Sequence, residues 1–150
     1  AQTPIQQTRI SVSSPLLGGY DEPEILRSSS RQICLKGADV GHMRAADIVV
    51  MPSIIKEQYG RVAPEAMACE TAVIVSDAGA LPELVGDAGI IVPQGDVVAL
   101  AAAIVDLLDR PEHRLELASR GKIRAHEGFS IDRQAAILDG LFRQHLKGLP

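Results

Sequence analysis

The sequence contains no tryptophan, and aromatic residues make up only 3% of its 150 residues. A core with so few aromatic rings must be built from Ala, Val, Leu and Ile, as is typical of parallel sheets covered by helices. Apolar residues make up 46% of the chain and charged residues 23%, which are ordinary proportions for a globular protein. Length and composition together predict a single domain over residues 1–150 with a core of its own.

Positive charge is also scarce. The formal net charge is −4, so the chain lacks the basic surface expected of a nucleic-acid-binding protein. The basic residues are scattered, with a mild excess over residues 110–124. We expect most of that excess to form a solvated helix face. The alternative is a peripheral contact with a membrane surface.

Membrane spans and a cysteine framework are missing as well. No run of 18 or more apolar residues occurs, and the chain does not open with the pattern of a signal peptide. Cys34 and Cys69 are the only cysteines, and both lie in apolar segments where buried free thiols are common. Two such residues provide neither a disulfide framework nor metal-ligand spacing. These features predict a cytoplasmic protein with reduced thiols.

Short β-branched segments alternate with segments of helical spacing along the chain. The predicted strands cover residues 10–13, 32–35, 47–51, 72–76 and 89–92. The predicted helices cover residues 24–29, 41–46, 61–69, 96–108, 111–126 and 130–146. Asp96 and Ser130 are expected to cap two of these helices, and Pro111 suits the first turn of another. Strand–helix–strand units form right-handed crossovers, so the pattern predicts an α/β fold with a parallel sheet.

The segment after strand 47–51 carries the candidate site. Ligands of an open parallel sheet bind beyond the carboxyl ends of its strands, and residues 52–60 lead from such an end into the helix at 61–69. The amides of Gly60, Arg61 and Val62 are expected to point outward at the helix start, where the helix dipole favours an anion. Gly60 has no side chain to keep a phosphate away from the backbone.

Two carboxylates flank this turn. Glu57 lies just before it, and Glu65 lies about one turn into the helix. Carboxylates accept hydrogen bonds from neighbouring hydroxyls such as those of a ribose or a hexose. The spacing alone fits two solvated surface acids better than a binding site. The two acids become a candidate site through their sequence context.

Several motifs surround these residues in a fixed order. They are Ala46-Asp47, Pro52-Ser53, Glu57, Gly60, Glu65-Ala66-Met67-Ala68-Cys69, Val73, Gly79, Pro82-Glu83 and Gly95-Asp96. With these motifs, residues 45–146 resemble the donor half of retaining glycosyltransferases of the GT-B fold, in family 4 (glycosyl transferases group 1). The resemblance implies a Rossmann-like parallel sheet with flanking helices that binds a nucleotide-diphosphate sugar.

Carried over residue by residue, the resemblance implies a role for each part of the E-x7-E motif. Glu57 would contact the donor sugar and support the charge that develops there, and Glu65 would bind the ribose. Gly60 and the amides of Arg61 and Val62 would hold the diphosphate. Glu83 would be a supporting acid near the sugar, or would instead cap the next helical turn. No Asp-x-Asp motif occurs, which fits a family that needs neither a metal nor another cofactor.

The sequence departs from the family pattern near the site. Gln58 stands where the family usually has Gly, and Glu70 replaces the usual Gly after the Ala-Cys pair. If that second position is left-handed, the replacement should cost about 1 kcal/mol. Arg61 stands where Leu is usual, and it would either reach the phosphate or remain a surface residue.

The larger departure lies near the start. The Gly-Arg-Leu strand and the Lys-Gly pair that open the family's donor domain are not found, and neither is its N-terminal acceptor domain. Transfer requires donor and acceptor to be held together, so we expect no turnover by this chain alone. The expected function is the donor half of an enzyme that transfers a hexosyl group to a sugar or lipid-linked acceptor, with the acceptor domain supplied in cis or in trans. The alternatives are a non-catalytic donor-binding subunit of a split enzyme and a remnant with a decayed site. The base, the sugar and the acceptor stay open.

Overall fold

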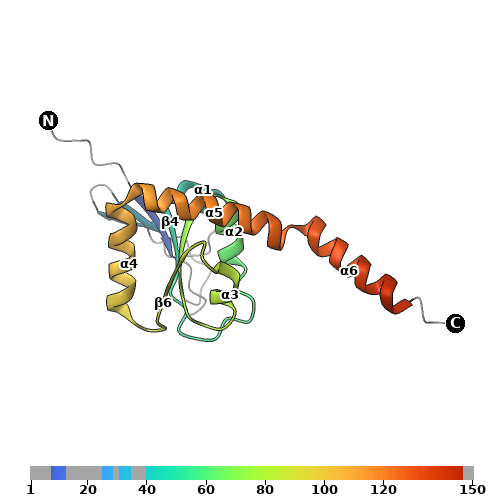
Figure 1. Ribbon diagram of the computed structural model, residues 1–150. Helices are drawn as coiled ribbons and strands as arrows, with labels where there is room; N and C mark the ends of the chain where they lie inside the picture. Colours follow the sequence, from blue (N-terminus) through green and yellow to red (C-terminus); the bar gives the residue numbers. More distant parts are fainter. Residues whose placement is uncertain (1–7, 13–24, 29–30, 35–39, 147–150) are drawn as a thin grey trace.

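A six-stranded sheet forms the centre of the structure, a computed structural model that describes residues 8–12, 25–28, 31–34 and 40–146 (Figure 1). The strands are β1 (Thr8–Val12), β2 (Ile25–Ser28), β3 (Arg31–Cys34), β4 (Ile48–Met51), β5 (Ala72–Ser76) and β6 (Ile90–Val92). The helices are α1 (Val40–Ala45), α2 (Val62–Ala68), α3 (Leu81–Val85), α4 (Val97–Asp109), α5 (Pro111–Phe129) and α6 (Ile131–Leu146). The order across the sheet is β2-β3-β1-β4-β5-β6.

Strands β1, β3, β4, β5 and β6 run parallel, which confirms the predicted α/β class. Strand β2 is antiparallel to β3, with Ile25 opposite Cys34 and Ser28 opposite Arg31. The helix expected at residues 24–29 was therefore wrong, because its described part, residues 25–28, is an edge strand. Only two residues separate β2 from β3. A hairpin ladder can form across so short a connection and outweighs a weak local preference for helix.

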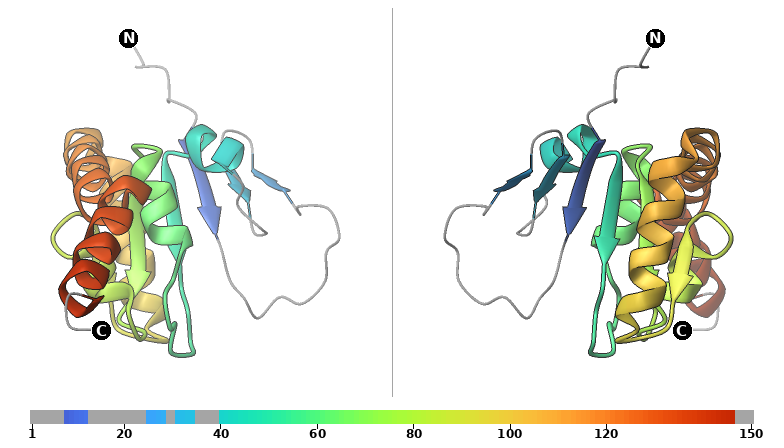
Figure 2. Two further views of the ribbon diagram at one scale, coloured as in Figure 1. Left: turned by 90° about the vertical axis from the view of Figure 1, so that its right-hand side faces the viewer. Right: turned by 90° about the vertical axis from the view of Figure 1, so that its left-hand side faces the viewer.

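Alternation along β4 and β5 divides the core between the two faces of the sheet. Ile48 and Val50 pack with Ile74 against α4 and the first half of α5. Val49 and Met51 face the other side, where α1, α2, α3 and the second half of α5 cover the sheet. Figure 1 shows the sheet nearly edge-on, with α4 on one side of it and α2 and α3 on the other, and Figure 2 shows its strands side by side. Every residue of β4 and of β5 is buried, as the continuous apolar runs predicted.

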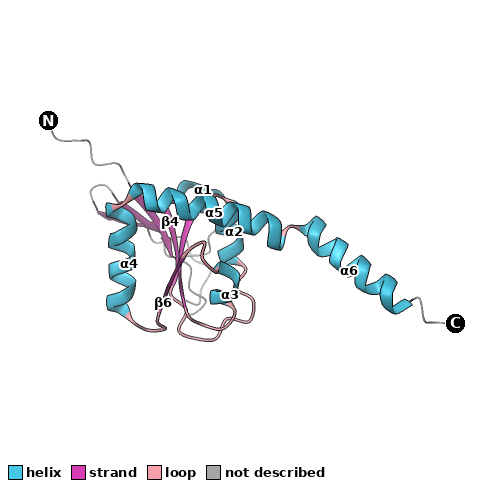
Figure 3. Cartoon of the chain, viewed as in Figure 1, coloured by secondary structure: helices cyan, strands magenta, loops and turns pink. Residues whose placement is uncertain are grey.

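The three C-terminal helices agree with the sequence pattern in order and type. The Asp96 carboxylate caps α4 by accepting a hydrogen bond from the Ala99 amide at 2.9 Å. Helix α5 begins at Pro111 and continues to Phe129, three residues beyond the expected end. Helix α6 follows Ser130, as predicted, but none of its residues is buried. Figure 3 shows α6 extending away from the sheet and the other helices.

Among the basic residues over 110–124, Arg110, Arg120 and Lys122 are exposed as expected, but Arg114 and Arg124 are not. Arg114 lies 3.4 Å from the carboxylate of Asp47, and its side chain is only 12% exposed. Arg124 donates to the carbonyl oxygens of Glu83 and Leu84 at 2.7 and 2.8 Å. These guanidinium groups connect α5 to neighbouring elements of the fold. Separately, none of the described helices is long and apolar enough to cross a membrane.

Helix α2 ends at a strained residue. Glu70 has a φ of 60°, the left-handed conformation that glycine adopts more easily. The amides of Glu70 and Thr71 bond to the carbonyls of Met67 and Ala66 at 2.9 and 3.1 Å, which is the Schellman pattern of a helix end. Lys122 of α5 donates to the Glu70 carboxylate at 2.6 Å. The expected left-handed site is confirmed, and an exposed ion pair accompanies the strain.

Replacement of Glu70 should reveal the cost of this conformation. Both Glu70→Gly and Glu70→Ala remove the ion pair with Lys122, but only glycine relieves the left-handed backbone. We expect Glu70→Gly to be more stable than Glu70→Ala by about 1 kcal/mol. Urea unfolding followed by circular dichroism would measure the difference. Equal stabilities of the two variants would contradict the assignment of strain to this residue.

Candidate functional site

The loop between β4 and α2 leaves the carboxyl edge of the sheet, at the lower edge in Figure 1. Most of its side chains are exposed, but Ser53 is only 1% exposed. Its hydroxyl donates a hydrogen bond to Oε1 of Glu57 at 2.8 Å. The predicted donor-site acid is thus a half-buried residue, held by a buried partner within an exposed loop.

The backbone of Glu57 is held from a second side by the loop between β5 and α3. The Ala80 amide donates to the Glu57 carbonyl at 2.9 Å. Gly79 has a φ of 64°, and a Cβ there would lie 2.7 Å from the Glu57 nitrogen and closer still to its carbonyl oxygen. The Gly79 of the family pattern is therefore required by the close approach of these two loops, as well as by its conformation.

Gly60 turns the chain into α2. Its φ is 64°, it is buried, and a side chain there would run into Leu81 of α3. Its neighbours Tyr59 and Arg61 are exposed, so the turn itself lies at the surface. Within the described residues, the amides of Gly60, Arg61 and Val62 donate no hydrogen bond. The turn thus contains three adjacent backbone amides without a partner among the described residues.

Glu65 and Arg61 form an ion pair on the surface of α2. The distance from Nε of Arg61 to Oε1 of Glu65 is 3.1 Å, and the two side chains are 77% and 39% exposed. Arg61 was expected either to reach the phosphate or to remain a surface residue. The structure places its side chain at the surface, paired with the Glu65 carboxylate. The pair engages Oε1 of Glu65, while Oε2 has no partner among the described residues.

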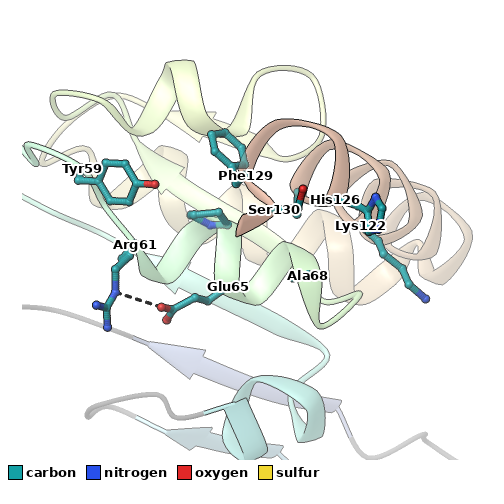
Figure 4. Close-up of a pocket in the computed structure, with 10 residues that line it drawn as sticks. Tyr59, Arg61, Glu65, Ala68, Lys122, His126, Phe129 and Ser130 are labelled. Carbon is teal, nitrogen blue, oxygen red and sulfur yellow. Dashed lines mark ion pairs between the residues drawn. The ribbon is translucent and has the colours of Figure 1, made fainter. Parts of the chain in front are cut away.

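Glu65 also borders a pocket of about 410 Å³ between α2 and the C-terminal end of α5. The pocket is lined by Tyr59, Arg61, Pro64, Glu65, Ala68, Lys122, Ala125, His126, Phe129 and Ser130. Figure 4 shows the Arg61–Glu65 pair at one rim and the ring of Phe129 at another. Glu57 does not line this pocket. The two acids of the motif therefore have different surroundings: Glu57 lies against the loop between β5 and α3, and Glu65 borders the pocket beside α5.

Other residues considered from the sequence have simpler surroundings. Glu83 lies in the first turn of α3 and is exposed, and its carboxylate makes no hydrogen bond or ion pair with a described residue. The described part of the chain contains no cluster of three His, Cys, Asp or Glu residues arranged for a metal. Cys69 is a free, half-buried thiol that packs against the core.

Sequence reasoning missed the residues that hold Glu57. Ser53 entered only as part of a Pro-Ser motif, and Ser76 only as the last residue of a strand. The Ser76 hydroxyl donates to the Ser53 carbonyl at 2.7 Å, which links the ends of β4 and β5. A serine at the end of an otherwise apolar buried strand was the available signal, because a buried hydroxyl needs a hydrogen-bond partner.

Comparison with known proteins gives a consistent result. Residues 16–110 match the family described as "Glycosyl transferases group 1". The phosphatidyl-myo-inositol mannosyltransferase of Mycolicibacterium smegmatis is 38% identical over 86 residues, which are 56% of this chain and 22% of that protein. The sucrose-phosphate synthase of Thermosynechococcus elongatus superposes with a TM-score of 0.68 at 33% identity, covering 79% of this chain and 31% of that one.

A further solved structure contains a ligand. Anabaena HepE in complex with UDP-glucose superposes with a TM-score of 0.65 at 26% identity, over 81% of this chain and 33% of that one. The chain spans about a quarter of the length of the curated relatives it matches, and about a third of these structures. What is similar is therefore one part of each longer protein.

The contact between Gly79 and Glu57 can be tested by a pair of glycine variants. Gly79 and Gly95 both have positive φ angles, but a Cβ at Gly95 would meet no atom within 4 Å. We expect Gly95→Ala to lower the free energy of unfolding by about 1 kcal/mol, the cost of the conformation alone. Gly79→Ala should lower it by about 3 kcal/mol or more, because the Cβ collides with backbone. Denaturant titration would compare the variants, and equal losses would contradict the close packing of the two loops.

Proposed function

Because this chain belongs to the glycosyl transferases group 1 family, we propose that it binds a nucleotide-diphosphate sugar as the donor half of a retaining, metal-independent glycosyltransferase. The enzyme would transfer a hexosyl group to a sugar or lipid-linked acceptor. The observation that carries the proposal is the position of Glu57 and Glu65 on either side of the Gly60 turn, at the carboxyl edge of a parallel sheet. In folds of this class, ligands bind at this edge.

The diphosphate is assigned to the turn at Gly60. The amides of Gly60, Arg61 and Val62 have no partner among the described residues, and backbone donors at a helix start favour an anion. The Arg61 guanidinium, 77% exposed, supplies a positive charge one residue away. These groups would neutralise the leaving diphosphate without a divalent ion.

The two sugars of the donor are assigned to the two acids. Glu57 accepts from Ser53 through Oε1, and Oε2 is available for a donor-sugar hydroxyl. In the reaction, the negative charge of Glu57 would support the positive charge that develops at the departing sugar. Oε2 of Glu65 is similarly available for a ribose hydroxyl, because the ion pair with Arg61 engages Oε1.

The similarity to HepE supports a nucleotide-diphosphate sugar as the class of ligand for this chain. That protein forms a complex with UDP-glucose, and the similarity extends over 81% of this chain at 26% identity. The base and the sugar bound by this chain are left to experiment. Transfer additionally requires an acceptor-binding domain, in cis or in trans, which the far greater length of the relatives supports.

Titration calorimetry of the 150-residue chain should separate the roles of the two acids. The ligands would be UDP-glucose with UDP, GDP-mannose with GDP and ADP-glucose with ADP. We expect Glu65→Ala to weaken the binding of the sugar nucleotide and of its nucleoside diphosphate by about tenfold or more, because a hydrogen bond from a ribose hydroxyl to the carboxylate is lost. Glu57→Ala should weaken the sugar nucleotide much more than the free nucleotide.

Glu112→Ala is the matched control, because Glu112 is an exposed glutamate on α5 outside this loop and helix. It should leave both affinities unchanged. Absence of binding by the wild-type chain at millimolar concentrations of all three sugar nucleotides would count against donor binding. Equal effects of Glu57→Ala on nucleotide and sugar nucleotide would count against its assignment to the sugar.

A further inference from the structure

Two buried hydroxyls form a chain of hydrogen bonds that leads from β5 to the Glu57 carboxylate. Ser76 donates to the Ser53 carbonyl at 2.7 Å, and Ser53 donates to Oε1 of Glu57 at 2.8 Å. Ser53 and Ser76 are 1% and 2% exposed. Only one other polar side chain, Thr71, is equally buried in the part of the chain that the structure describes. The buried polar groups are therefore concentrated behind Glu57.

The direction of the bond to Glu57 follows from the groups involved. An ionised carboxylate can only accept, so the single hydroxyl proton of Ser53 must point to Glu57. The Ser76 proton points to the Ser53 carbonyl, although the Met51 carbonyl also lies 3.4 Å from its oxygen. Each hydroxyl has one proton and each proton has an acceptor. This arrangement orients the carboxylate and leaves its second oxygen for a ligand.

The surrounding loop supplies little other restraint on the Glu57 side chain. Ile54, Ile55 and Tyr59 of the same loop are 58%, 47% and 56% exposed. The backbone of Glu57 is held through Ala80, but this bond leaves the side-chain torsions free. Within the described residues, Ser53 is the one group that bonds to the Glu57 carboxylate. Without it, this half-buried glutamate in an exposed loop would populate several rotamers.

We propose that Ser53 is the positioning residue for the donor-sugar carboxylate and that Ser76 holds Ser53 in place. The proposal rests on the donor-binding function proposed above. Ser53 aims Glu57 before the donor arrives, so the ligand does not have to order the side chain. The pair would therefore act on recognition of the sugar and leave recognition of the nucleotide unchanged.

The test compares two affinities in each variant by titration calorimetry of the full chain. Two probes are used. The first is whichever of UDP-glucose, GDP-mannose and ADP-glucose the wild type binds, and the second is the corresponding free nucleoside diphosphate. In Ser53→Ala we expect the preference for the sugar nucleotide to fall about tenfold, since a hydrogen bond to a charged group is lost. The affinity for the free diphosphate should stay within about twofold. Ser76→Ala should shift the preference in the same direction by a smaller factor.

Thr71→Val is the matched control. The Thr71 hydroxyl is also buried and donates to the Met43 carbonyl at 2.8 Å, but it precedes β5, at the opposite end from Ser76. Thr71→Val should lower the melting temperature much as the serine variants do, and it should leave the preference unchanged. A loss of preference in this control equal to that in Ser53→Ala would overturn the proposal, because general destabilisation would then explain the effect.

A double-variant cycle identifies the route of the effect. If Ser53 acts through Glu57, then Ser53→Ala should cause no further loss of preference in a Glu57→Ala background, where the hydroxyl has no side-chain acceptor at position 57. Full additivity would overturn the positioning role. A preference lost in Glu57→Ala but retained in both serine variants would overturn this inference and leave the donor-binding function standing. Wild-type chain that binds none of the probes would overturn both.

Discussion

The structure depends on the burial of β4 and β5 on both faces. Their side chains alternate between two cores, with Ile48 and Val50 on one side and Val49 and Met51 on the other. A shift of either strand by one residue would exchange the two sets of side chains, so the register is strongly specified. The loops that carry the candidate site begin where these strands end. The packing of the core thereby sets the position of every group in the site.

A few polar contacts fix the loops of the site to the buried strands. Ser76 ends β5 and bonds across to Ser53, which follows β4, so the two loops are held together at their origin. Gly79 and Ala80 then close against the backbone of Glu57 from the other side. Most of the surrounding loop is exposed, yet its one part-buried acid is restrained at side chain and backbone. A carboxylate held in this way suits recognition of a ligand that is itself polar and flexible.

Much of the architecture could be predicted because local patterns and tertiary packing agree. Continuous apolar runs predicted β4 and β5, and the Asp96 cap and periodic spacing predicted α4. The prediction failed at residues 24–29, where strand pairing with β3 decides the structure of the described part. Helix α6 was also predicted, but its apolar positions are exposed, because periodicity specifies a face without specifying what covers it.

The sequence by itself determined the order of the elements other than β2 and α3, the parallel crossovers, and the two candidate acids with the turn between them. These properties depend on nearest neighbours and on motifs that are contiguous in the chain. Only the tertiary structure decided that Arg61 pairs with Glu65, that Gly79 packs on Glu57, and that Ser53 bonds to its carboxylate while Ser76 holds Ser53. The pairings of Arg61 with Glu65 and of Ser53 with Glu57 depend on loop and side-chain geometry within one segment. The contacts of Gly79 and Ser76 join groups more than twenty residues apart. These groups become neighbours because parallel strands bring their carboxyl ends to one edge of the sheet.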